Sequence, residues 1–480
     1  MNIAAHLARA GLSAADRPAI AIGADTLHTY AELASRAAKL AGAMRRDLEP
    51  GEPVALVMAN CPEYLEVLYA CWHAGLIAVP VNAKLHLSEL AYILANSEAR
   101  ICFASPALAP GLSGLSGGRL RNVIEAGSSE YQAMLAGEPL PMEEVPPEAP
   151  AWLFYTSGTT GRPKGATLSH HNLRLMSWCY FADVDRQSPW TAILHAAPMS
   201  HGSGLYALPH VMQASCHVIP ESGGFDPAEV YELIAAWPNL VFFAAPTMVK
   251  RLLDHRADTD TSNLKTIVYG GGPMYTADSV AAIERFGPKL AQLYGQGETP
   301  MTITALPARF HAETGHPRWL ERLASVGLPQ SAVEVRTAGA DSRPLGPGEV
   351  GEILVRGQTV MSGYWRDPEA TAQTLRDGWL YTGDMGCFDE EGFLTLKDRA
   401  KDVIISGGSN IYPREVEDVL LRHDAVAEAA VVGRYDRGWG ETVVAYLVPQ
   451  AGATIDTAAL DRFCIDHIAR FKRPRFYRVI

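Results

Sequence analysis

Tyr155-Thr-Ser-Gly-Thr-Thr-Gly-Arg-Pro-Lys-Gly165 is the stretch of this 480-residue chain from which the fold and the chemistry follow. Its glycines let the backbone turn sharply and approach an anion, and its hydroxyl groups lie beside the cation of Lys164. The apolar run from Ala151 to Tyr155 predicts a short buried strand that leads into the loop. The stretch therefore indicates a phosphate-binding loop, whose candidate contacts are Thr156, Ser157, Gly158, Thr159, Thr160, Gly161 and Lys164.

Two other interpretations of this stretch exist. In P-loop NTPases the lysine follows a glycine directly and a hydroxyl residue follows the lysine, whereas here Pro163 precedes Lys164 and Gly165 follows it. A surface loop rich in serine, threonine and glycine is the plainer alternative. The complete string is more specific than such a composition, so we favour phosphate binding.

Length and composition bound the class of protein. A chain of 480 residues, 48% of them hydrophobic, is too large for one core and should divide into at least two domains. Alternating helical patterns and short apolar strands before residue 150 predict a mainly parallel α/β sheet. The formal net charge of -12 argues against nucleic acid or an anionic membrane surface as the main partner.

The cysteines and the apolar runs indicate the redox environment of the protein and its relation to membranes. Seven scattered cysteines without CxxC spacing predict small buried side chains in a reducing cytoplasm. The longest apolar region, from Tyr64 to Val81, is interrupted by charged residues, glycine and proline, so we expect no stable membrane insertion. The sequence does not define the oligomeric state, and a homodimer is compatible with it.

The eleven-residue string resembles the signature loop of the adenylate-forming superfamily, which comprises acyl-CoA synthetases, luciferases and peptide-synthetase adenylation domains. The similarity runs through nearly the whole chain. It implies an α/β fold with a large N-terminal domain of parallel-rich sheets and helices, residues 1–400, which binds ATP and the acid. It also implies a small, mobile α+β C-terminal domain, residues 401–480.

Two glycine-containing motifs downstream resemble parts of the family's acyl pocket. In Pro198-Met-Ser-His-Gly-Ser-Gly204 the family places a residue that lines the pocket at the position of His201, although a lone histidine can also be a satisfied structural residue. In Tyr269-Gly-Gly-Gly-Pro-Met274 three bare backbone positions, Gly270, Gly271 and Gly272, become candidates for contact with adenine and the acyl group. A tight turn without a ligand is the alternative there.

The segment Gln292-Leu-Tyr-Gly-Gln-Gly-Glu-Thr299 is close to the family's Tyr-Gly-x-Thr-Glu motif. The resemblance implies that Tyr294, followed by Gly295, stacks on adenine, and that Glu298 holds the Mg2+ that bridges the ATP phosphates. A helix-capping or solvated Tyr and Glu is the alternative. Gly297 stands where the family usually has threonine, so the hydroxyl contact to the α-phosphate is in question.

Trp379-Leu-Tyr-Thr-Gly-Asp384 matches the family's ribose-binding motif, which makes Asp384 the acceptor for both ribose hydroxyls. An aspartate in a surface turn is the alternative. By the same resemblance Arg399 contacts ribose or phosphate, and Lys401 is the hinge of the C-terminal domain.

The C-terminal domain carries the expected coenzyme A contacts. The resemblance implies that Gly407 and Gly408 line the tunnel for pantetheine, and that Trp439, Phe471 and Arg473 stack on or pair with the CoA nucleotide. Core packing of the two aromatic rings and a solvated arginine are the alternatives. The family's adenylation lysine belongs beyond Phe471-Lys-Arg-Pro474 and no residue up to Ile480 matches it, so we expect a truncation before it, with true loss as the alternative.

Together these motifs predict an AMP-forming acid–thiol ligase that uses ATP, Mg2+ and coenzyme A. Lys164, Thr160, Glu298 and His201 are its candidate catalytic residues. The acid is expected to be an aromatic or medium- to long-chain monocarboxylic acid, because no basic residue in the motifs would pair with a second carboxylate. Acyl transfer to a carrier-protein thiol and a catalytically weak nucleotide-binding regulator are the alternatives.

Overall fold

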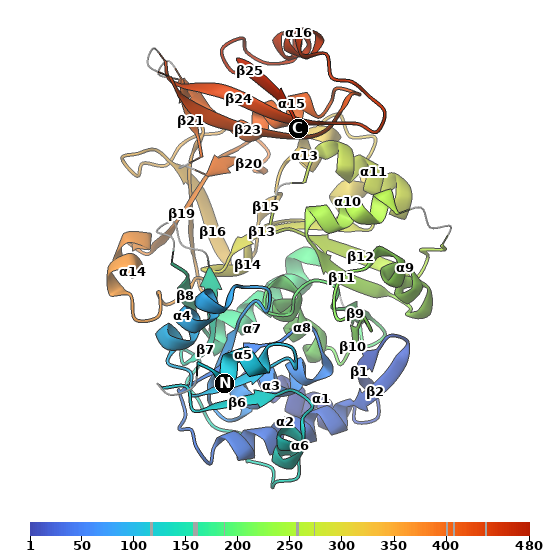
Figure 1. Ribbon diagram of the computed structural model, residues 1–480, viewed down its shortest axis with the longest axis vertical. Coiled ribbons are helices and arrows are strands. Elements are labelled where there is room, and N and C mark those ends of the chain that lie inside the picture. Colours follow the sequence, from blue (N-terminus) through green and yellow to red (C-terminus); the bar gives the residue numbers. More distant parts are fainter. Residues whose placement is uncertain are drawn as a thin grey trace.

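The computed structural model describes residues 1–115, 119–156, 162–186, 188–255, 259–272, 274–399, 402–406, 409–436 and 439–480, without the side chains of residues 398, 399, 409 and 410. Within these ranges the strands form four sheets, three in the body of the molecule and one, the C-terminal sheet, at the top of Figure 1. The predicted α/β class, with a large N-terminal part and a small α+β C-terminal part, is confirmed.

The largest sheet has the order β15-β14-β13-β12-β11-β9-β10-β1-β2. Its strands from β1 to β13 in this order pair in parallel, and antiparallel strands cover both edges. The strands are β1 (Pro18–Ile22), β2 (Asp25–Thr29), β9 (Ala192–Leu194), β10 (Cys216–Ile219), β11 (Leu240–Ala244), β12 (Leu264–Tyr269), β13 (Leu290–Gln296), β14 (Thr299–Leu306) and β15 (Leu328–Pro329).

The second sheet has the order β6-β5-β3-β4-β7-β8, parallel except for the final pair. It consists of β3 (Pro53–Val57), β4 (Ile77–Pro80), β5 (Ile101–Ala104), β6 (Asn122–Glu125), β7 (Pro150–Thr156) and β8 (Lys164–Ser169). The buried strand predicted before the phosphate loop is β7, and the loop connects it to β8, where Thr156 pairs with Lys164.

The two remaining sheets are mainly antiparallel. The third has β16 (Val333–Ala338), β17 (Gly351–Gly357), β18 (Leu375–Arg376), β19 (Trp379–Phe388) and β20 (Leu394–Arg399). The C-terminal sheet has β21 (Ile404–Ser406), β22 (Ser409–Ile411), β23 (Val426–Asp436), β24 (Gly440–Pro449) and β25 (Phe476–Val479).

Helices cover the sheets of the body (Figure 1). They are α1 (Ala5–Ser13), α2 (Tyr30–Met44), α3 (Pro62–His73), α4 (Leu87–Ser97), α5 (Ala109–Ser113), α6 (Ser129–Leu135), α7 (His170–Cys179) with the π-helix η1 (Tyr180–Val184), α8 (Gly202–Met212), α9 (Pro227–Ala236), α10 (Pro246–Asp254), α11 (Thr276–Phe286), α12 (Ala308–Ala312), α13 (Trp319–Ala324) and α14 (Pro368–Thr374). Two further helices, α15 (Pro413–Leu420) and α16 (Thr457–His467), belong to the C-terminal part. In the part of the chain that the structure describes, no helix is long and apolar enough to cross a membrane.

The C-terminal part has a hydrophobic core of its own. Buried side chains from β21, β23, β24, α15 and α16 pack together there, separately from the clusters of the body. A separate core is what an independently moving domain needs. The exact boundary at residue 401 stays a prediction, because Lys401 lies outside the described residues.

Buried histidines link the large sheet to α8. His195 Nδ1 lies 2.8 Å from Ser203 Oγ, and His195 Nε2 lies 3.1 Å from Nδ1 of His217 on β10. His210, on α8, bonds the backbone oxygen of Tyr206. Burial lowers the pKa of His195 and of His210 to about 3 each, so both rings are neutral in the folded protein at neutral pH.

Because of these buried neutral histidines, we expect the free energy of unfolding to fall at acidic pH. Because the folded-state pKa of His210 lies below its ordinary value near 6.5, the unfolded chain binds the extra proton first. The stabilisation is therefore complete above pH 6.5 and declines as the pH falls toward 3, by about 2 kcal/mol for one such histidine at pH 5. In urea titrations at pH 7 and pH 5, His210→Gln should show a smaller pH-dependent loss of unfolding free energy than the parent protein.

The exposed His467, on α16, supplies the control. His467→Gln should keep the parent pH dependence. An unchanged pH dependence in His210→Gln would contradict the interpretation of the buried cluster.

Candidate functional site

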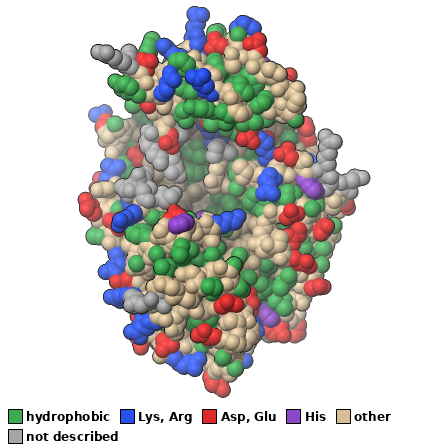
Figure 2. Space-filling model, in the orientation of Figure 1, with side chains coloured by type: hydrophobic (Ala, Val, Ile, Leu, Met, Phe, Trp, Pro, Cys, Tyr) green, Lys and Arg blue, Asp and Glu red, His purple; other side chains and the backbone are tan. Residues whose placement is uncertain are grey.

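A cleft of about 680 Å³ lies between the C-terminal part and the body of the molecule. The space-filling view shows the hollow beneath the top of the molecule (Figure 2). The cleft brings together five residues predicted from sequence, Gly271, Gly272, Tyr294, Gly295 and Asp384, with side chains of α15, β23 and β24 on its far side.

Asp384 forms one wall of this cleft and is held by two donors from β13. The Tyr294 hydroxyl and the Gln296 Nε2 each donate to Asp384 Oδ2 at 2.7 Å. Gln296 Nε2 also donates to the backbone oxygen of Thr382 at 3.0 Å. These bonds join the edge of the large sheet to β19 of the third sheet, so the carboxylate has a fixed position in the cleft.

The strand that carries Asp384 begins at a two-residue hairpin. Asp377 and Gly378 both have positive φ, of 51° and 77°, and connect Arg376 to its partner Trp379. An Asp-Gly pair is typical of such a turn, whose twist suits an antiparallel pair. In the middle of β19, Asp384 pairs with the backbone of Arg399 on β20, whose side chain lies outside the description.

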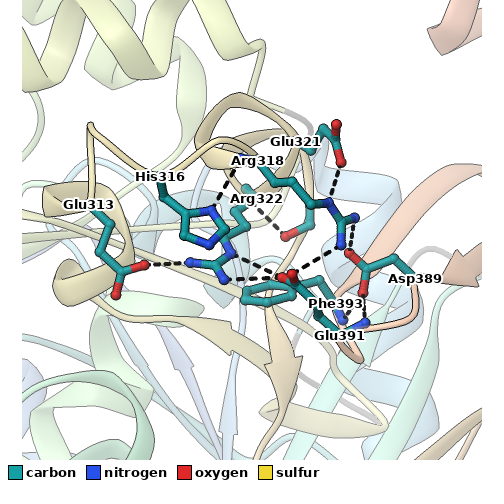
Figure 3. A network of polar contacts seen from close by, with 9 residues as sticks. Glu313, His316, Arg318, Glu321, Arg322, Asp389, Glu391 and Phe393 are labelled. Carbon is teal, nitrogen blue, oxygen red and sulfur yellow. Dashed lines mark hydrogen bonds and ion pairs between the residues drawn. The ribbon is translucent and has the colours of Figure 1, made fainter.

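A network of ion pairs fixes the turn between β19 and β20 (Figure 3). Arg318 contacts Asp389 at 2.7 Å and Glu391 at 3.3 Å, and Arg322 contacts Glu391 at 3.1 Å as well as Glu313. The two arginines come from the segment around α13, so the network attaches the hairpin to the body. Strand β20, which leads toward residue 401, is therefore attached to the body at its start.

Glu298 lies at the junction of β13, β7 and the third sheet. The residue is 9% exposed, and its Oε1 accepts hydrogen bonds from Thr156 Oγ1 at 3.2 Å and from the Tyr364 hydroxyl at 2.7 Å. Burial, together with the negative charge of Glu298, raises the pKa of Tyr364 well above its ordinary value. The phenol therefore stays protonated and donates.

Lys164 lies over the ring of the same tyrosine. Its ammonium group lies 5.3 Å from the centroid of the Tyr364 ring, within cation–π range. The structure thus brings three sequence-predicted residues, Thr156, Lys164 and Glu298, around a tyrosine that was not predicted.

His201 lies directly before α8, among aromatic side chains. Its ring meets that of Phe154 edge to face at 5.4 Å, and its Nδ1 bonds Ser200 Oγ at 2.8 Å. Burial lowers the pKa of His201, which favours the neutral imidazole. A Cβ at Gly202 would lie 2.9 Å from Phe243 and 3.0 Å from Met301, so these two side chains pack closely against the helix start.

Gly297 is the position where the sequence departs from the family's threonine. A Cβ there would lie 2.5 Å from Thr156 Cγ2 and 2.6 Å from Cδ1 of Phe154. Real side chains do not approach so closely, hence Phe154 and Thr156 occupy the room that a larger residue at 297 would need. Gly270, unlike its two successors, lies against Leu293 of β13 and outside the cleft lining.

The predicted CoA contacts have different partners on the C-terminal part. Trp439 is 46% exposed and is covered by the guanidinium of Arg475, 4.1 Å from its centroid. Phe471 is 52% exposed, whereas Arg473 is paired with Asp461 at 3.3 Å. Arg475, not Arg473, is therefore the arginine next to the exposed indole.

The remaining predicted residues lie outside the described ones: Ser157, Gly158, Thr159, Thr160, Gly161, Lys401, Gly407 and Gly408. Sequence reasoning missed Gln296, Tyr364 and Arg475. The aromatic turn Gly363-Tyr-Trp365 was visible in the sequence, but nothing local to it indicates that its hydroxyl reaches a carboxylate 66 positions away.

Comparisons with known proteins agree along nearly the whole chain. The family model described as AMP-binding enzyme matches residues 7–365, and the model described as AMP-binding enzyme C-terminal domain matches residues 415–480. The chain is similar to a feruloyl-CoA synthase of Amycolatopsis sp, with 37% identity over 94% of this chain and 89% of that protein.

Two further similarities cover equally long stretches. A medium/long-chain-fatty-acid–CoA ligase, FadD8, of Mycobacterium tuberculosis is 33% identical over 96% of this chain and 82% of that protein. The crystal structure of ATP-bound MatB from Rhodopseudomonas palustris superposes with a TM-score of 0.90 at 30% identity, covering 100% of this chain and 95% of that one.

The ion-pair network of Figure 3 predicts a measurable contribution to stability. Arg322→Gln removes the contacts to Glu313 and Glu391 and leaves two carboxylates without their shared cation. We expect a loss of about 1 kcal/mol in the free energy of unfolding, smaller in 1 M salt, because these pairs are partly exposed. Urea titration at low and high salt measures it.

Arg343, which pairs with Asp341, is the matched control because its side chain is 83% exposed. Arg343→Gln should change stability by less than about 0.5 kcal/mol. Equal effects of the two substitutions would contradict a special role for the network.

Proposed function

Because this chain belongs to the AMP-binding enzyme family, we propose that it is an ATP-dependent acid:CoA ligase for apolar monocarboxylic acids, aromatic or of medium to long chain length. The observation that carries the proposal is the cleft that joins Tyr294 and Asp384 of the body to the C-terminal part. The ferulate and fatty-acid activities named for two relatives support the acid class.

The chemistry explains why ATP is needed. A carboxylate is a poor electrophile, because its charge repels nucleophiles and oxide is a poor leaving group. An oxygen of the acid attacks the α-phosphorus of ATP, pyrophosphate leaves, and the product is a mixed anhydride with AMP. The thiol of coenzyme A, losing its proton, then attacks the acyl carbon and AMP leaves with the bonding electrons.

The residues of the cleft suit the nucleoside part of ATP. Asp384 is an acceptor of fixed position for the ribose hydroxyls, and the buried ring of Tyr294 with the bare backbone of Gly271 and Gly272 suits a flat base. Lys164 and the hydroxyl-rich loop beside it would bind the phosphates, where a cation offsets the charge that develops on the leaving group.

Glu298 is the residue that would hold Mg2+. Among the described residues, both hydrogen bonds to its carboxylate fall on Oε1, and no donor among them bonds Oε2. A buried carboxylate with an oxygen left for a hard cation fits magnesium, which commonly binds through one or two carboxylates plus substrate phosphates. When bound, the ion neutralises charge on the phosphates and orients them.

The acid would lie near His201. The neighbouring side chains Phe154, Tyr206, Phe243 and Met301 are apolar or aromatic, and Tyr206 meets Phe243 edge to face at 6.3 Å. The lowered pKa of His201 keeps its imidazole uncharged, so it does not compensate a second carboxylate. Apolar acids with one carboxylate suit these surroundings best.

The C-terminal part would bring coenzyme A. Its described hydrogen bonds to the body are long: Tyr275 to Glu417 and Arg414 to Met274 at 3.5 Å, and Lys250 to Ala427 at 3.4 Å. Contacts of this length are weak, which supports a domain that turns about Lys401 between the two half-reactions. The Trp439–Arg475 stack supports a site for the CoA nucleotide. All seven cysteines are described and free, which supports a reducing compartment such as the cytoplasm.

The test is AMP release by the full-length protein with ATP, Mg2+, coenzyme A and a panel of acids. The panel contains benzoic, cinnamic, short- to long-chain fatty and dicarboxylic acids. We expect release that requires both acid and coenzyme A and is fastest with an apolar monocarboxylic acid. Lys164→Ala should lower this rate about 10²-fold or more, because it removes a charge that stabilises the transition state.

Lys39→Ala, on α2, should keep the parent rate and preference. Transfer only to a carrier-protein thiol would contradict the coenzyme A assignment, and a preference for dicarboxylic acids would contradict the apolar pocket. Absence of release across the panel, with ATP still bound, would favour a regulatory protein.

A further inference from the structure

The segment from Met361 to Trp365 connects the turn that carries Glu298 to strand β8, which carries Lys164. Its Met361 N–H donates to the backbone oxygen of Glu298 at 2.8 Å, and its Trp365 N–H donates to the backbone oxygen of Gly165 at 2.7 Å. Between these ends, Gly363 accepts from the N–H of Thr167 at 2.9 Å. One short segment is thus hydrogen-bonded both to the Glu298 turn and to the strand that follows the phosphate loop.

Tyr364 is the side chain of this segment that enters the site. Its hydroxyl donates to Glu298 Oε1 at 2.7 Å, and its ring lies 5.3 Å from the Lys164 ammonium. Tyr364 therefore contacts both an acidic and a basic residue that the proposed function assigns to metal and phosphate binding.

The side chain is held in place by its own backbone. The Tyr364 N–H donates to Thr371 Oγ1 at 2.8 Å, and Tyr364 forms an isolated bridge with Ala166 of β8. A donor that is fixed in this way restricts the rotation of the carboxylate it contacts. With Oε1 engaged by Tyr364 and Thr156, the plane of the Glu298 carboxylate is set before any ion binds.

We propose that Tyr364 is a positioning residue for the divalent cation: its hydroxyl fixes Glu298 so that Oε2 is presented to the metal, while its ring retains Lys164 beside the same site. The inference rests on the proposed function, in which Glu298 is the metal ligand. Groups that hydrogen-bond a metal ligand commonly change metal affinity by 10- to 100-fold when removed.

The variant Tyr364→Phe removes the hydroxyl that contacts Glu298 and keeps the ring that contacts Lys164, so it tests the hydroxyl alone. Mn2+ in place of Mg2+ is titrated into the full-length protein at saturating ATP, and the free ion is followed by electron paramagnetic resonance. We expect the dissociation constant for Mn2+ to rise about 10-fold in Tyr364→Phe, with ATP affinity in the absence of metal unchanged because the ring still faces Lys164. If the Tyr364 hydroxyl only supported the local structure, its loss would change the affinities for Mn2+ and for ATP together.

Two further variants make the outcomes distinct. Glu298→Gln should weaken Mn2+ binding more than Tyr364→Phe does. Tyr231→Phe, which loses a buried hydrogen bond to the backbone oxygen of Leu252 at 2.9 Å away from the site, should bind Mn2+ like the parent protein.

Parent-like Mn2+ binding in Tyr364→Phe, with loss in Glu298→Gln, would overturn the role of Tyr364 and leave the proposed function standing. Parent-like binding in Glu298→Gln would overturn both the role of Tyr364 and the assignment of Glu298 as a metal ligand, whereas the ligase activity is tested separately by AMP release. Equal weakening in Tyr231→Phe would also overturn the inference, because any lost hydroxyl would then have the same effect.

Discussion

One carboxylate oxygen, Oδ2 of Asp384, joins the large sheet to the third sheet. Asp384 Oδ2 accepts from Tyr294 and from Gln296, so the end of β13 in the large sheet is tied to β19 in the third sheet. An ionised carboxylate taken partly out of water needs such donors, and hydrogen bonds to a charged group are stronger than neutral ones. The same bonds that join the sheets leave the aspartate on the wall of the cleft.

A second carboxylate repeats this arrangement on the phosphate side. Thr156, at the end of β7, and Tyr364, between β17 and α14, each donate a hydrogen bond to Glu298. Each of these contacts joins segments that are distant in sequence. Among the described residues, hydroxyl groups and one side-chain amide donate to these two carboxylates. Lys164 lies over the ring of Tyr364, beside the loop that would bind an anionic ligand. The ion pairs of Figure 3 lie farther out, where they attach the β19–β20 turn to the body.

The sequence predicted the parts of the fold that depend on local patterns. The buried strand before the phosphate loop and the alternating helices and strands are confirmed, because apolar periodicity is a property of neighbouring positions. Strand β25 was not predicted, since its parallel pairing with β24 depends on a contact about thirty residues back. Gln296, Tyr364 and Arg475 were missed for the same reason: their partners are set by the tertiary fold.

The central claim is that the Asp384 wall of the cleft holds the sugar of an adenine nucleotide. Calorimetric titration of AMP into the parent protein and into Asp384→Asn tests it most directly, with Trp439→Ala as the reference for the C-terminal part. Losing a charged acceptor should weaken AMP binding roughly 10- to 100-fold in Asp384→Asn, while Trp439→Ala binds AMP like the parent. Equal affinity of Asp384→Asn and the parent protein would contradict the account.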